Sequence, residues 1–142
     1  QANAREAGVE DRVTFQVRDA GDPELAGAYD LALAVECVHD MSDPVSVLSA
    51  MRRLVGEGGT VLIVDERVPD TFAPNGDAVE RMMYGFSVLH CLPVGMVETP
   101  SAETGTVMRR PTFHRYAQEA GFTKVDELPI ENDFFRFYRL TG

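Results

Sequence analysis

The chain has 142 residues, of which 44% are hydrophobic and 25% are charged. This length suffices for one domain with a single core and is too short for two ordinary domains. The 23 acidic and 13 basic residues give a formal net charge of −10. Because the basic residues are scattered and form no stripe, we expect no nucleic-acid partner.

Cysteine usage and hydropathy exclude several further classes of protein. Cys37 and Cys91 are far apart and form no C-x-x-C motif, so the sequence indicates neither a disulfide scaffold nor a zinc site. No apolar run approaches the roughly 18 to 20 residues that span a bilayer, and the first residues do not resemble a signal peptide. We therefore expect a soluble, cytoplasmic protein without a membrane partner.

The first elements are a helix end and a strand. Residues 1–7 are polar and contain alanine, and Gly8 follows them, which is typical of a helix that ends here and began further upstream. Residues 12–18 alternate polar and apolar side chains and predict a strand. Residues 19–23 predict the loop that follows it.

The middle of the chain predicts a strand, a helix and a second strand. Residues 29–35 are apolar apart from one aspartate, as in a strand buried on both faces of a parallel sheet. Ser42 or Asp43 can cap a helix that starts at Pro44, and residues 60–64 form another apolar strand. Two parallel strands joined by a helix make a right-handed crossover, so the fold class is α/β.

The last third predicts two more helices and a hairpin. Residues 77–89 have a broad apolar face, and residues 93–110 form an irregular excursion rich in Gly, Pro, Ser and Thr. Thr112 is expected to cap a short helix that ends at Ala120. The alternating aromatic residues near the end predict an antiparallel hairpin with a tight turn at residues 131–133.

Taken together, these elements resemble the later part of class I S-adenosylmethionine-dependent methyltransferases, and in particular the small-molecule O-methyltransferases. The resemblance rests on an ordered set of short motifs over almost the whole chain. They are Asp11 to Phe15, Asp19-Ala20, Tyr29 to Leu31, His39-Asp40, Gly58-Gly59, Asp65-Glu66, Ala120-Gly121-Phe122 and the closing hairpin.

The resemblance implies a Rossmann-like sheet of strand order 3-2-1-4-5-7-6, of which this chain supplies strands three to seven. Residues 1–142 are then the C-terminal part of one methyltransferase domain, with an acceptor-side insertion at about 68–111. The glycine-rich turn after the first strand is missing, because the one glycine cluster, at residues 56–59, precedes a strand. Without strands one and two, the strand at 29–35 would have an open apolar edge.

The resemblance also implies which residues bind the cofactor, S-adenosylmethionine. Asp19 and Ala20 match the pair that contacts the adenine ring, although an Asx-type turn that only closes the strand explains the same residues. Val35, Glu36 and Cys37 match positions beside the methionine portion. Glu36 could equally cap a neighbouring helix or face solvent.

His39 is the candidate general base. In the related O-methyltransferases the matching histidine removes the acceptor's hydroxyl proton, and Glu66 matches a carboxylate that orients it. This sequence departs from the family pattern, because Met41 replaces a tryptophan and no second carboxylate stands near Arg109. His39 could instead pack or cap the next helix. A metal site of His39, Asp40 and Asp43 lacks further ligands at a recognisable spacing, so we expect none.

Met83, Tyr84, Phe86 and Met96 are the candidate acceptor-binding residues, because Met and aromatic side chains make an adaptable apolar wall. The same residues could be core or a subunit contact, and a homodimer is compatible with the sequence.

The expected function is methyl transfer from S-adenosylmethionine to a small molecule, at a hydroxyl group. Two alternatives stay open: a non-catalytic domain that retains the methyltransferase fold, and an NAD(P)-dependent oxidoreductase.

Overall fold

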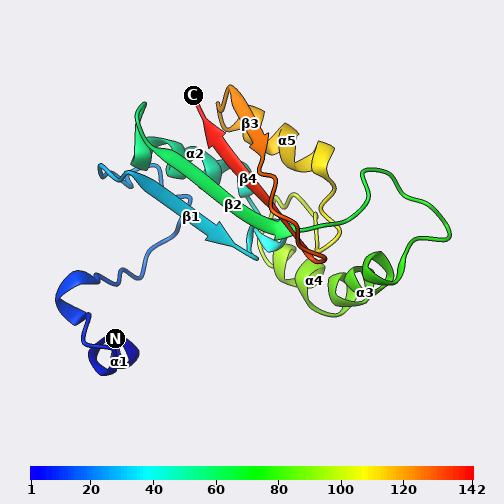
Figure 1. Ribbon diagram of the computed structural model, residues 1–142, viewed down its shortest axis with the longest axis horizontal. Helices are drawn as coiled ribbons and strands as arrows, with labels where there is room; N and C mark the ends of the chain where they lie inside the picture. Colours follow the sequence, from blue (N-terminus) through cyan, green and yellow to red (C-terminus); the bar gives the residue numbers. More distant parts are fainter.

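The computed structural model describes residues 1–142 and has a four-stranded sheet at its centre (Figure 1). Its strands are β1 (Leu31–Val35), β2 (Thr60–Glu66), β3 (Lys124–Glu127) and β4 (Phe135–Thr141), in the spatial order β1-β2-β4-β3. This order equals the 4-5-7-6 part of the order expected from the sequence. The α/β class and the sheet type are therefore confirmed.

β1 and β2 are parallel and are joined by α2 (Pro44–Val55), as the sequence predicted. Of the two residues expected to cap α2, Asp43 does so: its side chain accepts a hydrogen bond of 2.9 Å from the backbone N–H of Ser46. The helix ends at Gly56, whose φ of +61° is in the left-handed region that favours glycine.

β3 and β4 form the predicted antiparallel hairpin, and β4 also pairs antiparallel with β2. The connection, residues 128–134, is longer than the tight turn that we expected. The side chain of Asn132 organises it by accepting hydrogen bonds from the backbone N–H groups of Phe134 and Phe135. A polar side chain thus does here what a two-residue turn does in shorter hairpins.

The hydrophobic core lies between the sheet and two helices, α2 and α5 (Arg110–Glu119), which cover the same face (Figure 1). Phe113 of α5 stacks on Tyr138 of β4 with ring centroids 4.2 Å apart, and both side chains are buried. The prediction that Thr112 caps this helix was wrong. The cap position is Arg109, three residues earlier, and Pro111 occupies the first turn of the helix, where no amide hydrogen is needed.

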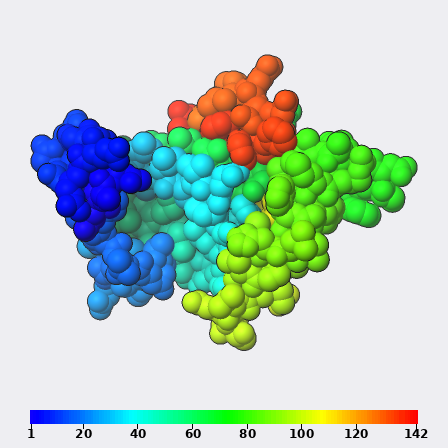
Figure 2. Space-filling model, turned by 90° about the horizontal axis from the view of Figure 1, so that it is seen from below, coloured from blue at the N-terminus to red at the C-terminus, as the bar shows by residue number.

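The opposite face of β1 is uncovered. Leu31, Leu33 and Val35 alternate along the strand and are all exposed, whereas Ala32 and Ala34 between them turn toward α2. β1 pairs only with β2, so its other edge is open, as the sequence predicted. Figure 2 shows this cyan segment at the surface, between the dark blue N-terminal residues and the green helical region.

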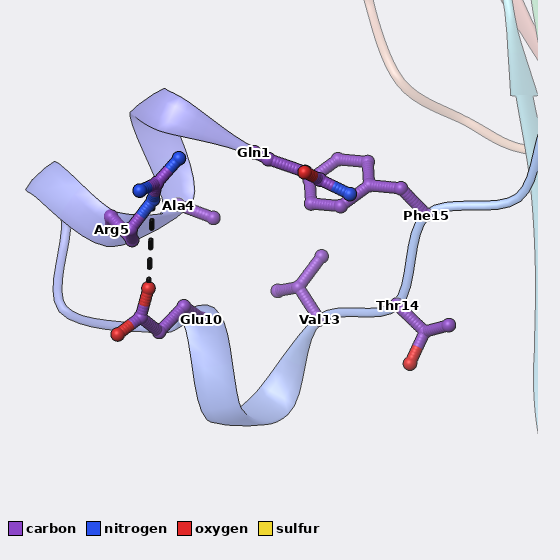
Figure 3. Close-up of a pocket in the computed structure, with 7 residues that line it drawn as sticks. All are labelled: Gln1, Ala4, Arg5, Glu10, Val13, Thr14 and Phe15. Carbon is purple, nitrogen blue, oxygen red and sulfur yellow. Dashed lines mark ion pairs between the residues drawn. The ribbon is translucent and has the colours of Figure 1, made fainter.

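The N-terminal segment extends away from the sheet (Figure 1). It contains α1 (Ala2–Glu6), followed by Gly8 at φ +64°, and a short 3-10 helix (Glu10–Arg12). The strand predicted at residues 12–18 is not formed, because no neighbouring strand offers it hydrogen-bond partners. A hollow of about 540 Å³ separates α1 from residues 13–15 (Figure 3).

The helical region after β2 is longer than predicted. α3 (Ala78–Phe86) continues through a π-helical stretch (Ser87–Cys91) into α4 (Leu92–Gly95), where we expected the helix to end at Leu89. Pro93 stands in the first turn of α4, directly after the π-helical stretch. None of the helices has the length and apolarity needed to cross a membrane.

Candidate active site

The carboxyl ends of β1 and β2 meet α3 and the loop before β4 around a cavity of about 590 Å³. In parallel sheets ligands bind at this edge, because the loops that follow the strands converge there. A short 3-10 helix (Val38–Asp40) after β1 brings His39 to the cavity, and the end of β2 brings Glu66. The two residues expected to act together are therefore adjacent in space.

His39 is almost fully buried, with 3% of its surface exposed, and its Nδ1 lies 2.6 Å from an oxygen of Asp65, which is 1% exposed. Asp65 also accepts hydrogen bonds from the backbone N–H groups of Val38 and Glu66, at 3.2 and 3.0 Å. Because an ionised carboxylate can only accept, Nδ1 carries the hydrogen and donates it. Asp65 therefore fixes both the tautomer and the orientation of the ring.

Glu66 approaches the same nitrogen, with 2.7 Å between its Oε2 and His39 Nδ1. A single N–H cannot point straight at two carboxylates, so Glu66 shares the Nδ1–H with Asp65 and is the weaker of its two partners. Sequence reasoning singled out Glu66 and missed Asp65, the stronger partner. The signal was present, since Asp65 directly precedes Glu66 at the end of the strand.

These three groups perturb one another's pKa values. Burial alone would lower the pKa of His39, but the hydrogen bonds to Asp65 and Glu66 outweigh it and raise the pKa to about 11. Burial, assisted by the charge of Asp65 and opposed by His39, raises the pKa of Glu66 to about 8. For Asp65, burial is outweighed by the hydrogen bond from His39, and its pKa is lowered. The cluster therefore holds protons tightly.

Three of the expected cofactor residues lie at this edge. Val35 ends β1 and is exposed, Glu36 lines the cavity, and Cys37 is half-buried, so that burial raises the pKa of its thiol. Glu36 has a φ of +54°, a left-handed conformation that costs a non-glycine residue about 1–2 kcal/mol. Its N–H still donates to Val64 of β2, at 2.8 Å. Backbone strain of this kind gathers at functional sites.

The other two expected cofactor residues are not part of this site. Asp19 and Ala20 are exposed and lie outside the cavity lining. Asp19 accepts a 2.9 Å hydrogen bond from the N–H of Gly21, which is the Asx-type turn considered as the alternative. Because the preceding segment does not join the sheet, the structure does not bring this turn to the sheet's edge.

The expected acceptor residues divide into two groups. Met83 and Phe86 line the cavity, whereas Tyr84 and Met96 do not. Successive residues of a helix point about 100° apart, and Tyr84 turns toward Arg109, whose guanidinium donates to its hydroxyl at 3.0 Å. Met82, in the same predicted stretch, also lines the cavity. Sequence reasoning missed the lining residues that come from other segments, which are His90, Cys91, Thr106, Phe134 and Phe135.

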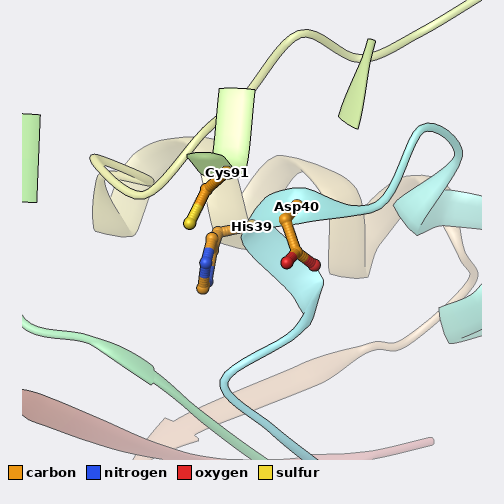
Figure 4. Close-up of side chains that lie close together, drawn as sticks. All are labelled: His39, Asp40 and Cys91. Carbon is orange, nitrogen blue, oxygen red and sulfur yellow. The ribbon is translucent and has the colours of Figure 1, made fainter. Parts of the chain in front are cut away.

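Cys91 lies close to His39 and Asp40, although it is about 50 residues away in the sequence (Figure 4). The three side chains offer ligand atoms within 4.8 Å of one another. We expected no such set, because spacing alone suggested only Asp40 and Asp43 as neighbours of His39. Asp43 instead caps α2, and the π-helical stretch supplies Cys91 in its place.

Residues 2–127 match the sequence pattern of the methyltransferase domain family. The chain belongs to this family. Over 65 residues this methyltransferase chain is 35% identical to ajmaline N-methyltransferase and 32% identical to norajmaline N-methyltransferase, both from Rauvolfia serpentina. Each alignment covers 45% of this chain and 22% of the relative.

Solved methyltransferase structures share the fold over 99% of the chain. The S-adenosylmethionine-dependent methyltransferase SibL superposes with a TM-score of 0.74 and 19% sequence identity. An O-methyltransferase family protein from Burkholderia thailandensis superposes with a TM-score of 0.70 and 19% sequence identity. PigF, whose structure contains S-adenosylhomocysteine (SAH), superposes with a TM-score of 0.70 and 16% sequence identity. The methyltransferase chain spans 38%, 39% and 39% of these proteins, respectively.

These findings confirm the class I methyltransferase fold and S-adenosylmethionine as the family's cofactor. The oxidoreductase alternative is wrong, because the match is to methyltransferases.

Proposed function

We propose that this chain carries the catalytic base and the acceptor cavity of an enzyme that methylates a hydroxyl group of a small molecule. The 2.6 Å hydrogen bond between buried His39 and Asp65 is the observation that carries the proposal. It engages Nδ1 within the protein, which leaves the other nitrogen of this cavity-lining histidine, Nε2, for the substrate.

The residues at the edge of the sheet fit the cofactor. Bound S-adenosylmethionine supplies an electrophilic methyl group on a positively charged sulfur. Glu36, in its left-handed conformation, and Asp40 bring carboxyl groups to the cavity beside the end of β1, where a positive charge is stabilised. Val35 and Cys37 flank Glu36 in the chain, and we propose that they contact the methionine portion.

In the proposed reaction the acceptor oxygen forms a bond to the methyl carbon while the carbon–sulfur bond breaks and its electron pair stays on sulfur. His39 Nε2 takes the hydroxyl proton, and Asp65 stabilises the imidazolium that forms. We propose that Glu66 helps to orient the ring. Since the cluster holds protons tightly, it must lose one before it can accept another.

We further propose that residues 1–142 are the C-terminal part of one methyltransferase domain and that residues 68–111 cover the acceptor. The position of α3 supports this, because Met82, Met83 and Phe86 form one side of the cavity. Asp19 and Ala20 remain proposed adenine contacts, which would require their turn to move to the edge of the sheet.

The test uses the protein as its gene encodes it in full, with S-adenosylmethionine labelled by ¹³C in the methyl group and a panel of phenols and alcohols. The ¹³C chemical shift of the product distinguishes oxygen, nitrogen and carbon methylation. We expect an O-methyl product, and a product methylated only at nitrogen or carbon would overturn the proposal. Binding of SAH by calorimetry, without transfer to any acceptor, would instead support the non-catalytic domain.

A further inference from the structure

We propose that the acceptor carries a protonated amine, which is held by the carboxyl groups of the cavity while its hydroxyl is methylated. This inference rests on the proposed function, because it names the substrate class of the same cavity. It depends on three observations: the charge of the lining, a buried polar atom without a partner, and the aromatic wall.

The charged lining residues of the cavity are predominantly acidic. Glu36 and Asp40 face it, no Lys or Arg is among its lining residues, and His39 and His90 are the only basic side chains there. The charge of His39 is paired with buried Asp65, and Glu66, whose pKa burial raises to about 8, is mostly uncharged at neutral pH. Burying an ammonium group is favourable only beside opposite charge. This lining therefore favours a positively charged ligand over a neutral or anionic one.

One polar atom of the lining residues is buried without a hydrogen-bond partner. It is Oγ1 of Thr106, in a residue that is 2% exposed. Unpaired buried polar groups are rare in proteins and call for an explanation such as a missing ligand. An ammonium group has several N–H donors, and one of them can satisfy this hydroxyl.

The remaining wall fits the apolar body of such a molecule. Phe86, Phe134 and Phe135 line the cavity with Met82 and Met83. Aromatic faces attract cations, and methionine side chains adapt to irregular apolar shapes. An aromatic amine with a hydroxyl group therefore matches the carboxyl groups, the wall and His39 at the same time.

The cofactor offers a rival explanation, because its sulfonium is also a cation. Its product, SAH, has a neutral thioether in the same place. Measuring acceptor binding in the presence of SAH therefore removes the sulfonium charge from the comparison.

The experiment compares tyramine with 4-propylphenol in the full-length gene product saturated with SAH. The two probes have the same length and differ in an ammonium against a methyl group. We expect tyramine to bind about tenfold more tightly, on the scale of one desolvated cation contact. Asp40→Asn and Thr106→Val should each reduce this ratio, whereas Glu57→Gln, at an exposed turn, should leave it unchanged.

Equal binding of the two probes would overturn the inference. A second result would also overturn it: an Asp40→Asn variant that still prefers tyramine but no longer distinguishes S-adenosylmethionine from SAH. The carboxyl groups would then bind the cofactor and not the acceptor. The two proposals fail separately. Preferred binding of tyramine with methylation only at its nitrogen refutes the proposed function alone, and O-methylation of both probes without preference refutes the inference alone.

Discussion

Asp65→Asn is the substitution that most sharply separates a positioned base from a buried structural histidine. In the wild type the Asp65 carboxylate lies 2.6 Å from His39 Nδ1 and both residues are almost fully buried. In one orientation the asparagine amide presents its own N–H group to the Nδ1–H, and in the other it presents an uncharged oxygen in place of the carboxylate. A nearby opposite charge typically moves a pKa by about 1–3 units, so the pKa of His39 should fall from about 11 by that amount.

The free energy of unfolding should fall as well. Removing one partner of a buried ion pair costs about 3–5 kcal/mol, because the other charge is left uncompensated. Loss of the correct tautomer should lower kcat by a factor of about 10³ to 10⁴, as in Ser-His-Asp enzymes, while the Kd for SAH changes little.

The assays are ¹⁵N NMR titration of the histidine ring, thermal unfolding and methyl-transfer kinetics. Asp126→Asn, which removes a carboxylate from the exposed ion pairs on β3, is the matched control. An Asp65→Asn enzyme with wild-type kcat and an unchanged His39 pKa would refute the reasoning.

Three further predictions concern pH, stability and metals. His39 must lose its second ring proton before it can act as the base, so kcat/KM should rise roughly tenfold per pH unit up to the His39 pKa of about 11. A flat profile would argue against this base. Arg109→Met leaves buried Glu80 (2% exposed) without its 2.6 Å partner, so the free energy of unfolding, measured thermally, should fall by about 3–5 kcal/mol. Arg115→Met removes an exposed ion pair and should lower it by only about 0–1 kcal/mol. EDTA should leave activity unchanged, because the proposed transfer uses no metal. Added Zn²⁺ should inhibit the enzyme by binding His39, Asp40 and Cys91 (Figure 4), and Cys91→Ser should relieve that inhibition. Equal inhibition of the wild type and of Cys91→Ser would contradict this prediction.

The parts of the fold that sequence predicted correctly depend on local patterns. The apolar run of β1, the capped and amphipathic α2 and the run of β2 give the parallel crossover directly, and the alternating aromatics give the hairpin. The strand expected at residues 12–18 failed for a non-local reason. Its pattern is suitable, but a strand exists only where a neighbour pairs with it.

The site was predictable to the extent that it depends on strand ends. His39 and Glu66 follow two adjacent parallel strands, and their approach could be expected from topology. Cys91 lies beyond the expected helix end at Leu89, and Thr106 lies in the irregular segment after α4, so their places beside the cavity could be found only in the structure. Tyr84 was wrongly placed in the cavity lining for a local reason: it is one residue after Met83 on α3, and that step turns its side chain out of the cavity.

The most direct test of the central claim is single-turnover methyl transfer by His39→Gln, measured beside the wild type at saturating S-adenosylmethionine and with SAH affinity determined in parallel. If His39 is the base, transfer to a hydroxyl should fall by about 10² to 10⁴, with SAH binding within threefold of wild type, roughly 0.7 kcal/mol. Wild-type transfer by this variant would contradict the account, because the buried histidine would then be structural and the proton would leave by another route.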